Sequence, residues 1–158
     1  LFRSSDIKPK LRLVPIDAII QKQMNVLRPI WMKKSIRINE NVPNELMVET
    51  DPDIIAIVVR NIISNAIKFS FKNGVIDVNS NVTDGFLEIS IADYGIGMSP
   101  QQVESVFAGY VSTRGTENEK GAGIGLLTCK EFVEKLKGRI GVKSELNKGT
   151  TFTITIPV

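Results

Sequence analysis

The feature that most constrains the fold is the stretch DPDIIAIVVRNIISNAIKFS, residues 51–70, in which aliphatic residues predominate. Asp51 is a favourable N-cap and Pro52 suits the first helical position, so the sequence predicts a long apolar helix that begins here. Polar residues interrupt the apolar run at positions i, i+4 and i+7, namely Asn61, Asn65 and Lys68. This spacing predicts that the three side chains share one face of the helix.

The region ahead of this helix is less regular. Residues 1–13 are polar and broken by proline, and we interpret them as a linker from something upstream. Apolar residues recur at helical spacing over residues 16–34, which predicts a helix that Pro29 kinks near its end. Residues 35–41 and 46–50 predict two short strands, and we expect these strands to pair with each other.

Strands and helices continue toward the C-terminus, as is typical of a single α/β domain of this length. Between residues 108 and 121 the sequence is irregular and charged, with the length and composition of a mobile loop. The predicted elements are a hairpin of strands over 75–82 and 86–93, a short helix over 99–107, a helix over 124–136 closed by Gly138, and strands over 139–145 and 151–158.

Composition excludes several kinds of function. The sequence has no histidine, so it cannot supply a Ser-His-Asp triad, an imidazole base or a conventional zinc site. Its single cysteine, Cys129, cannot form a disulfide within the chain, and we expect it to be buried in a helix. The net charge is +3, with Lys and Arg scattered among acidic residues, so nucleic acid is not expected as a partner. No stretch approaches the roughly 18 apolar residues of a membrane span, so the chain itself is not expected to contact a membrane.

Two glycine-containing motifs raise the question of a ligand. The first, DYGIGMS over residues 93–99, places the carboxylate of Asp93 where a strand ends and follows it with Gly95 and Gly97. A carboxylate in this position can accept a hydrogen bond from an amine, although an aspartate at a strand end also begins ordinary turns. Both interpretations remain open at this point.

The second motif, GAGIGL over residues 121–126, leads directly into a predicted helix. It does not fit the dinucleotide pattern G-x-G-x-x-G, and the phosphate-loop pattern G-x-x-x-x-G-K-[ST] occurs nowhere in the chain. A helix N-terminus with uncovered backbone N–H groups is nevertheless a favourable seat for phosphate. The alternative is a flexible hinge before an ordinary helix.

The asparagines of the apolar helix also admit two interpretations. An asparagine amide within such a helix must find hydrogen-bond partners or remain unsatisfied. An amide oxygen such as that of Asn65 can ligate Mg²⁺, a hard cation that prefers oxygen ligands and is usually shared with substrate phosphates. Alternatively, the polar face simply meets water.

The order of these motifs is more specific than any one of them. N-x-x-x-N-A-x-K, D-x-G-x-G, V-F-x-x-Y, G-x-G-x-G-L and G-T-T-F follow one another along the chain. This succession resembles the catalytic and ATP-binding domain of sensor histidine kinases, and the resemblance covers residues 14–158. It implies an α/β (α+β) two-layer sandwich in which a mixed sheet packs on about three helices and ATP binds beneath a mobile lid.

For the phosphate end of the nucleotide, the resemblance implies that Asn65 ligates Mg²⁺, that Asn61 lines the metal and phosphate site, and that Lys68 holds phosphate. Arg114 could reach the terminal phosphate, or it could be a solvated surface residue. Gly121, Gly123 and Gly125 would close the lid onto the phosphates, and Leu126 would be a further nucleotide-binding residue.

For the adenine end, the resemblance implies that Asp93 recognises the exocyclic amine. Gly95 and Gly97 would let the backbone lie close to the nucleotide, and Thr150 would support the base through water. The family's aromatic box corresponds to Phe107 and Tyr110.

The resemblance also bears on the reaction. The hydrolysing ATPases of the gyrase and chaperone type carry a glutamate base where this chain has Asn61, so hydrolysis is expected to be slow. We expect a histidine kinase whose acceptor histidine lies on a separate dimerisation domain of the same receptor, with a response regulator receiver domain as a further partner. The whole receptor would be a membrane-anchored bacterial sensor with this domain in the cytoplasm. The alternatives are a gyrase- or chaperone-like ATPase and a non-catalytic nucleotide-sensing module.

Overall fold

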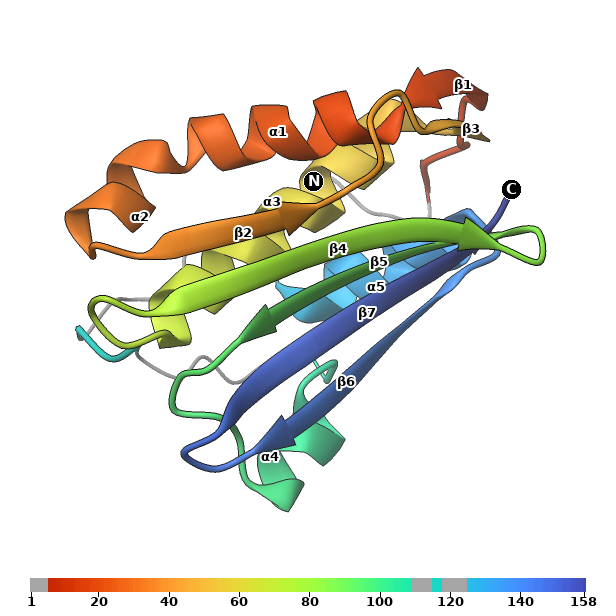
Figure 1. The fold of residues 1–158 in the computed structure, drawn as a ribbon. Coiled ribbons are helices and arrows are strands. Elements are labelled where there is room, and N and C mark those ends of the chain that lie inside the picture. Colours follow the sequence, from red (N-terminus) through yellow and green to blue (C-terminus); the bar gives the residue numbers. More distant parts are fainter. Residues whose placement is uncertain (1–5, 109–114, 118–124) are drawn as a thin grey trace.

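A computed structural model describes residues 6–108, 115–117 and 125–158 (Figure 1). Helices are interspersed with strands along the chain, as the sequence predicts. In order, the elements are β1 (Arg12–Pro15), α1 (Ile16–Val26), α2 (Arg28–Lys33), β2 (Arg37–Asn41), β3 (Met47–Thr50), α3 (Pro52–Phe69), β4 (Val75–Thr83), β5 (Phe86–Asp93), α4 (Pro100–Ser105), α5 (Leu126–Lys135), β6 (Arg139–Glu145) and β7 (Gly149–Pro157).

The main sheet has five strands in the order β2-β4-β5-β7-β6. Strands β2 and β4 are parallel, whereas the other neighbouring strands are antiparallel, so the sheet is mixed. Helices α3 and α5 pack on one face of this sheet, and α1 lies along α3 (Figure 1). The predicted two-layer α/β arrangement is therefore confirmed.

Helix α3 lies at the centre of the core because its sequence is apolar on most sides. Asp51 caps its start, since the Asp51 Oδ1 atom accepts hydrogen bonds from the backbone N–H groups of Asp53 at 2.9 Å and Ile54 at 3.2 Å. Strands β4, β5 and β7 place alternate apolar side chains against the helix and polar ones on the opposite face of the sheet. Within the described ranges, no helix is both long and apolar enough to cross a membrane.

The predicted pairing of residues 35–41 with 46–50 is wrong. Strand β2 instead pairs in parallel with β4, and β3 pairs antiparallel with β1 in a separate two-stranded sheet. Strand β1 begins at Arg12, inside the segment interpreted as a linker, and supplies the partner that β3 requires. The segment just before β1 is also attached to the domain, because the Lys10 backbone N–H donates a hydrogen bond to the Asp51 carboxylate at 2.8 Å.

Two helix ends refine the predictions. The predicted kink near Pro29 is a break, since α1 ends at Val26 and α2 carries the proline in its first turn. At the end of α5, Lys137 takes the left-handed conformation with φ of 60°, not Gly138. Gly138 is needed for another reason, because a Cβ atom there would press on the backbone oxygen of Thr155.

Candidate functional site

The C-terminal half of α3 carries the polar strip that the sequence predicts. Asn61 uses its amide N–H group within the helix, donating to the Ile57 carbonyl at 2.8 Å. Asn65 is half-buried, and its amide makes no hydrogen bond within the part of the chain that the structure describes. Lys68 is only 9% exposed, and its ammonium lies 4.9 Å from the centre of the Phe69 ring. This strip is not a fully solvated helix face, because its lysine is buried and its asparagines are half-buried.

Asp93 lies at the end of β5 and is 5% exposed. One carboxylate oxygen accepts a hydrogen bond from the Gly95 backbone N–H at 2.9 Å, so the turn predicted as an alternative role is also present. Burial raises the pKa of Asp93 from its ordinary 3.8 to about 6, against the lowering effects of backbone hydrogen bonds from Gly95 and Thr150 and of the Lys34 charge. The carboxylate is thus kept at a strand end although burial disfavours its ionised form, and an ionised carboxylate there is a strong acceptor for an amine.

The glycines around Asp93 have an intramolecular reason. A Cβ atom on Gly95 would overlap the Phe69 carbonyl at the end of α3. Gly97 has φ of 66°, and a Cβ atom there would overlap the Glu145 carbonyl. The DYGIGMS loop therefore packs between the end of α3 and the β6–β7 turn, and these contacts explain both glycines without an approaching nucleotide.

Thr150 lies beside Asp93, its partner in the β5–β7 register. It is 6% exposed, and its hydroxyl lies 2.7 Å from the Ser144 hydroxyl, which also accepts from the Met98 N–H at 2.8 Å. The Ser144 hydroxyl donates to the Gly149 carbonyl at 2.9 Å. Sequence reasoning missed Ser144, although its position opposite Thr150 in the β6–β7 register places it in this network.

The structure describes part of the region between α4 and α5. Gly125 is the exposed N-cap residue of α5, and Leu126, the first helical residue, packs against the core. Phe107 packs edge-on against Phe152, with ring centres 6.2 Å apart. Thr116 donates its backbone N–H to the Lys68 carbonyl at 3.1 Å and its hydroxyl to the Ser70 carbonyl at 2.6 Å. The predicted residues that lie outside the described ranges are Tyr110, Arg114, Gly121 and Gly123.

The side chains at this site suit a metal ion that is shared with a bound ligand better than a metal ion that protein atoms hold alone. The described residues contain no group of three or more His, Cys, Asp and Glu side chains that could hold a metal ion. Mg²⁺ commonly takes one or two protein oxygens and completes its shell with phosphates and water. The uncommitted amide of Asn65 fits that arrangement.

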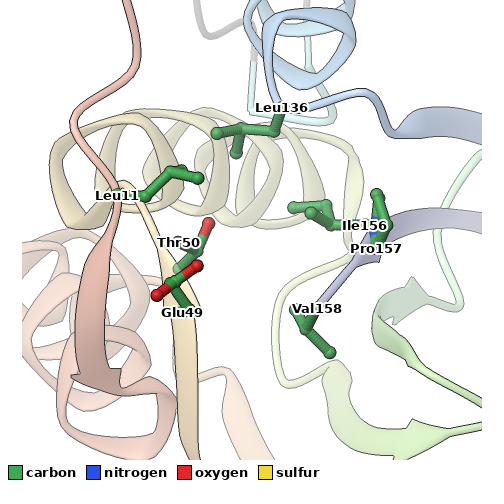
Figure 2. Close-up of a pocket in the computed structure, with 7 residues that line it drawn as sticks. All are labelled: Leu11, Glu49, Thr50, Leu136, Ile156, Pro157 and Val158. Atoms are coloured by element: carbon green, nitrogen blue, oxygen red, sulfur yellow. The ribbon is translucent and has the colours of Figure 1, made fainter.

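A separate pocket of about 240 Å³ lies at the other end of β7 (Figure 2). It is lined mainly by apolar side chains, with Thr50 and Glu49 as its polar residues. Pro157 belongs to this pocket and pairs with Phe86, whereas Thr150 and Asp93 pair at the opposite end of the same two strands. The pocket is therefore distinct from the polar site.

Comparison with known proteins identifies the fold and its family. Residues 50–158 match the family described as histidine kinase-, DNA gyrase B-, and HSP90-like ATPase. The chain belongs to this family. The predicted resemblance to the catalytic ATP-binding domain of sensor histidine kinases is thereby confirmed, and the named relatives are such kinases.

Adaptive-response sensory kinase SasA of Synechococcus elongatus is 34% identical over 149 residues, which cover 93% of this chain and 38% of SasA. The solved catalytic domain of the histidine kinase ThkA matches with a TM-score of 0.82 at 25% identity, over 94% of this chain and 95% of that one. ThkA has also been solved in complex with the response regulator protein TrrA.

Full-length ShkA, solved in complex with AMPPNP, matches with a TM-score of 0.78 at 25% identity, over 98% of this chain and 33% of that one. This chain spans 13% to 42% of the length of curated relatives such as SasA.

Proposed function

We propose that this chain is the ATP-binding catalytic domain of a two-component sensor histidine kinase and that it delivers the γ-phosphate of ATP to a histidine on a separate domain. The observation that carries the proposal is the buried Asp93 carboxylate at the end of β5. The polar strip of Asn61, Asn65 and Lys68, on the last turns of the central helix, supports it. ATP as the ligand is further supported by the AMPPNP complex of ShkA.

Asp93 and Thr150 form the adenine end of the proposed site. The Asp93 carboxylate accepts the exocyclic amine of adenine, and a charge-assisted bond of this kind contributes about 1.5–3 kcal/mol. Thr150 and Ser144 hold each other's hydroxyl groups in place at 2.7 Å, so they present a fixed polar edge beside the carboxylate. Packing of the DYGIGMS loop against α3 keeps this edge in position.

Asn65 and Lys68 form the phosphate end. Asn65 offers an amide oxygen to Mg²⁺, and Lys68 offers a positive charge to phosphate oxygens. A Mg²⁺ ion held by Asn65 together with the phosphates would supply positive charge that offsets the charge developing in phosphoryl transfer. Arg114 and the glycines at 121, 123 and 125 would complete the phosphate contacts.

Asn61 decides between transfer and hydrolysis. An amide cannot take a proton from water at neutral pH, so this site lacks the base that a hydrolysing ATPase needs at this position. Phosphoryl transfer depends mainly on positioning and charge stabilisation, and a histidine acceptor is itself the nucleophile. The site therefore favours transfer over hydrolysis.

The sequence has no histidine, so the acceptor must come from another domain. We propose the histidine-bearing dimerisation domain of the same receptor as that acceptor. A response regulator receiver domain is the proposed next partner, supported by the complex of ThkA with TrrA. A cytoplasmic position for this domain, within a membrane-anchored sensor, belongs to the same proposal.

Calorimetric titration of the 158-residue chain with AMPPNP, with and without Mg²⁺, tests the binding half of the proposal. We expect saturable binding that Mg²⁺ strengthens, because Asn65 offers it an oxygen ligand. The absence of binding in both titrations would refute a nucleotide site.

A further inference from the structure

Lys34 is a buried lysine that the proposed mechanism does not use. It lies at the C-terminal end of α2 and is 6% exposed, although lysine is rarely buried unless it is paired. Its ammonium donates hydrogen bonds to the backbone carbonyls of Ile67 at 2.8 Å and Lys68 at 3.0 Å. A buried charge is thus directed at the helix that carries the polar strip.

These two carbonyls are among the last four of α3, which lack partners within the helix. The other two are satisfied by backbone groups, since Ser70 N–H donates to the Ala66 carbonyl at 3.0 Å and Ile96 N–H donates to the Phe69 carbonyl at 3.1 Å. The Lys68 carbonyl also accepts the Thr116 backbone N–H at 3.1 Å, so Lys34 shares the capping of that group and is the partner of the Ile67 carbonyl. A positive charge here also interacts favourably with the negative end of the helix dipole.

The same ammonium acts on the adenine end of the site. Among the described residues, Lys34 is the charged side chain that lowers the pKa of Asp93, whereas the other lowering groups are the backbone N–H groups of Gly95 and Thr150. The backbone of Lys34 also holds the α3–β4 turn, because its carbonyl accepts from the Asn73 N–H at 3.0 Å. The C-cap residue of α2 thus contacts the phosphate-side helix and acts on the base-side carboxylate.

We propose that Lys34 is a positioning residue of the nucleotide site, which fixes the last turn of α3 beneath Lys68 and places a positive charge within electrostatic reach of Asp93. This inference rests on the proposed function and adds a residue that the motifs of the sequence do not include. If Lys34 acted only by capping α3, and its charge did not reach Asp93, its removal would lower the stability of the fold but would leave the proton affinity of Asp93 unchanged.

Three variants separate these roles. Lys34→Met removes both the charge and the donors, and Lys34→Gln removes the charge while keeping N–H donors. Lys33→Met is the matched control, because it removes the same charge from the exposed neighbouring position of the same helix. If Lys34→Met fails to fold, Lys34→Gln decides the question.

The first measurement is an NMR titration of the Asp93 carboxyl group in the nucleotide-free chain. We expect the pKa of Asp93 to rise in both Lys34 variants and to remain unchanged in Lys33→Met, because removing a nearby positive charge disfavours the ionised form. An unchanged Asp93 titration in both Lys34 variants would overturn the electrostatic role.

The second measurement is the affinity for Mg·ADP relative to wild type at pH 6 and pH 8, a ratio in which the titration of the ligand cancels. If the proton affinity of Asp93 rises tenfold, the ionised fraction at pH 6 falls about fivefold and that at pH 8 hardly changes. We therefore expect a loss of up to about fivefold at pH 6 that shrinks at pH 8. Wild-type affinity in both Lys34 variants at pH 6 would refute the positioning role. If the wild-type chain binds no nucleotide, the proposed function fails, while the carboxyl titration still decides whether Lys34 acts on Asp93.

Discussion

Replacing Asp93 with asparagine is expected to change stability and nucleotide affinity in opposite directions. The native carboxyl group has a pKa of about 6 against 3.8 in the unfolded chain, so the native state binds this proton more tightly. The stabilising contribution of the group is then fully present below pH 3.8 and is lost as the pH rises through 6. At pH 7 the buried carboxylate disfavours the folded state by about 3 kcal/mol.

The asparagine side chain introduced by Asp93→Asn would carry no charge to bury, and its amide oxygen can still accept the Gly95 N–H. We expect this substitution to raise the free energy of unfolding by up to about 3 kcal/mol at pH 7, with the gain disappearing toward pH 4. Nucleotide affinity should fall about ten- to a hundredfold, because the charge-assisted bond to the adenine amine is lost. The site would thus hold a destabilising carboxylate because recognition requires it.

Urea denaturation at pH 4 and pH 7 measures the first effect, and calorimetry with Mg·AMPPNP measures the second. Glu88→Gln is the matched control, since Glu88 is an exposed carboxylate on the same strand and should change neither quantity. An Asp93→Asn variant that is no more stable than wild type at pH 7 would refute the burial argument. An unchanged affinity would remove Asp93 from the adenine site.

Three further substitutions or reactions test other parts of the account. Asn65→Ala should abolish the Mg²⁺ dependence of AMPPNP binding in calorimetry; a variant that still binds more tightly with Mg²⁺ would exclude this metal ligand. Gly95→Ala should lower the free energy of unfolding by about 1–3 kcal/mol or more, because the new Cβ overlaps the backbone of α3. Gly141→Ala, where a Cβ meets no atom within 4 Å, is its control in the same urea experiment. Burial raises the pKa of the Cys129 thiol to about 12, so this thiol should react with a disulfide reagent only as fast as the chain unfolds, and rapid reaction in native buffer would contradict its burial.

Elements with strong local signals were predictable from the sequence. Asp51 and Pro52 mark the start of α3, and its apolar run marks its extent. Ser99 begins α4 with a capping box closed by Gln102, a signal contained within four residues. The β4–β5 hairpin follows from alternation on either side of a tight turn at Asp84 and Gly85.

Strand pairing was harder to predict because it depends on distant residues. Strand β3 lies close to β2 in the sequence but pairs with β1, which has only four residues and begins inside the segment interpreted as a linker. The two glycines after Asp93 illustrate the same limit. Their spacing was visible, but the backbone of α3 and the Glu145 carbonyl, which they contact, come from other parts of the chain.

The residues of the candidate site also divide into those that a local sequence pattern indicated and those whose contacts depend on distant parts of the chain. Motif order indicated Asn65, Lys68 and Asp93, because each belongs to a compact pattern. Lys34 carries no motif, and its partners lie 33 and 34 residues away. Thr116 contacts Ser70 across 46 residues, so no local pattern could reveal that contact. The predictions for Tyr110, Arg114, Gly121 and Gly123 fall outside the described residues and stay predictions.

Phosphoryl transfer tests the central claim most directly. The 158-residue chain, supplied with γ-labelled ATP, Mg²⁺ and a separate dimerisation domain that bears the acceptor histidine, should transfer label to that domain. The same acceptor with alanine in place of its histidine should remain unlabelled, and little free phosphate should form because Asn61 cannot act as a base for water. Rapid release of free phosphate with no labelled acceptor would contradict the account and indicate an ATPase instead.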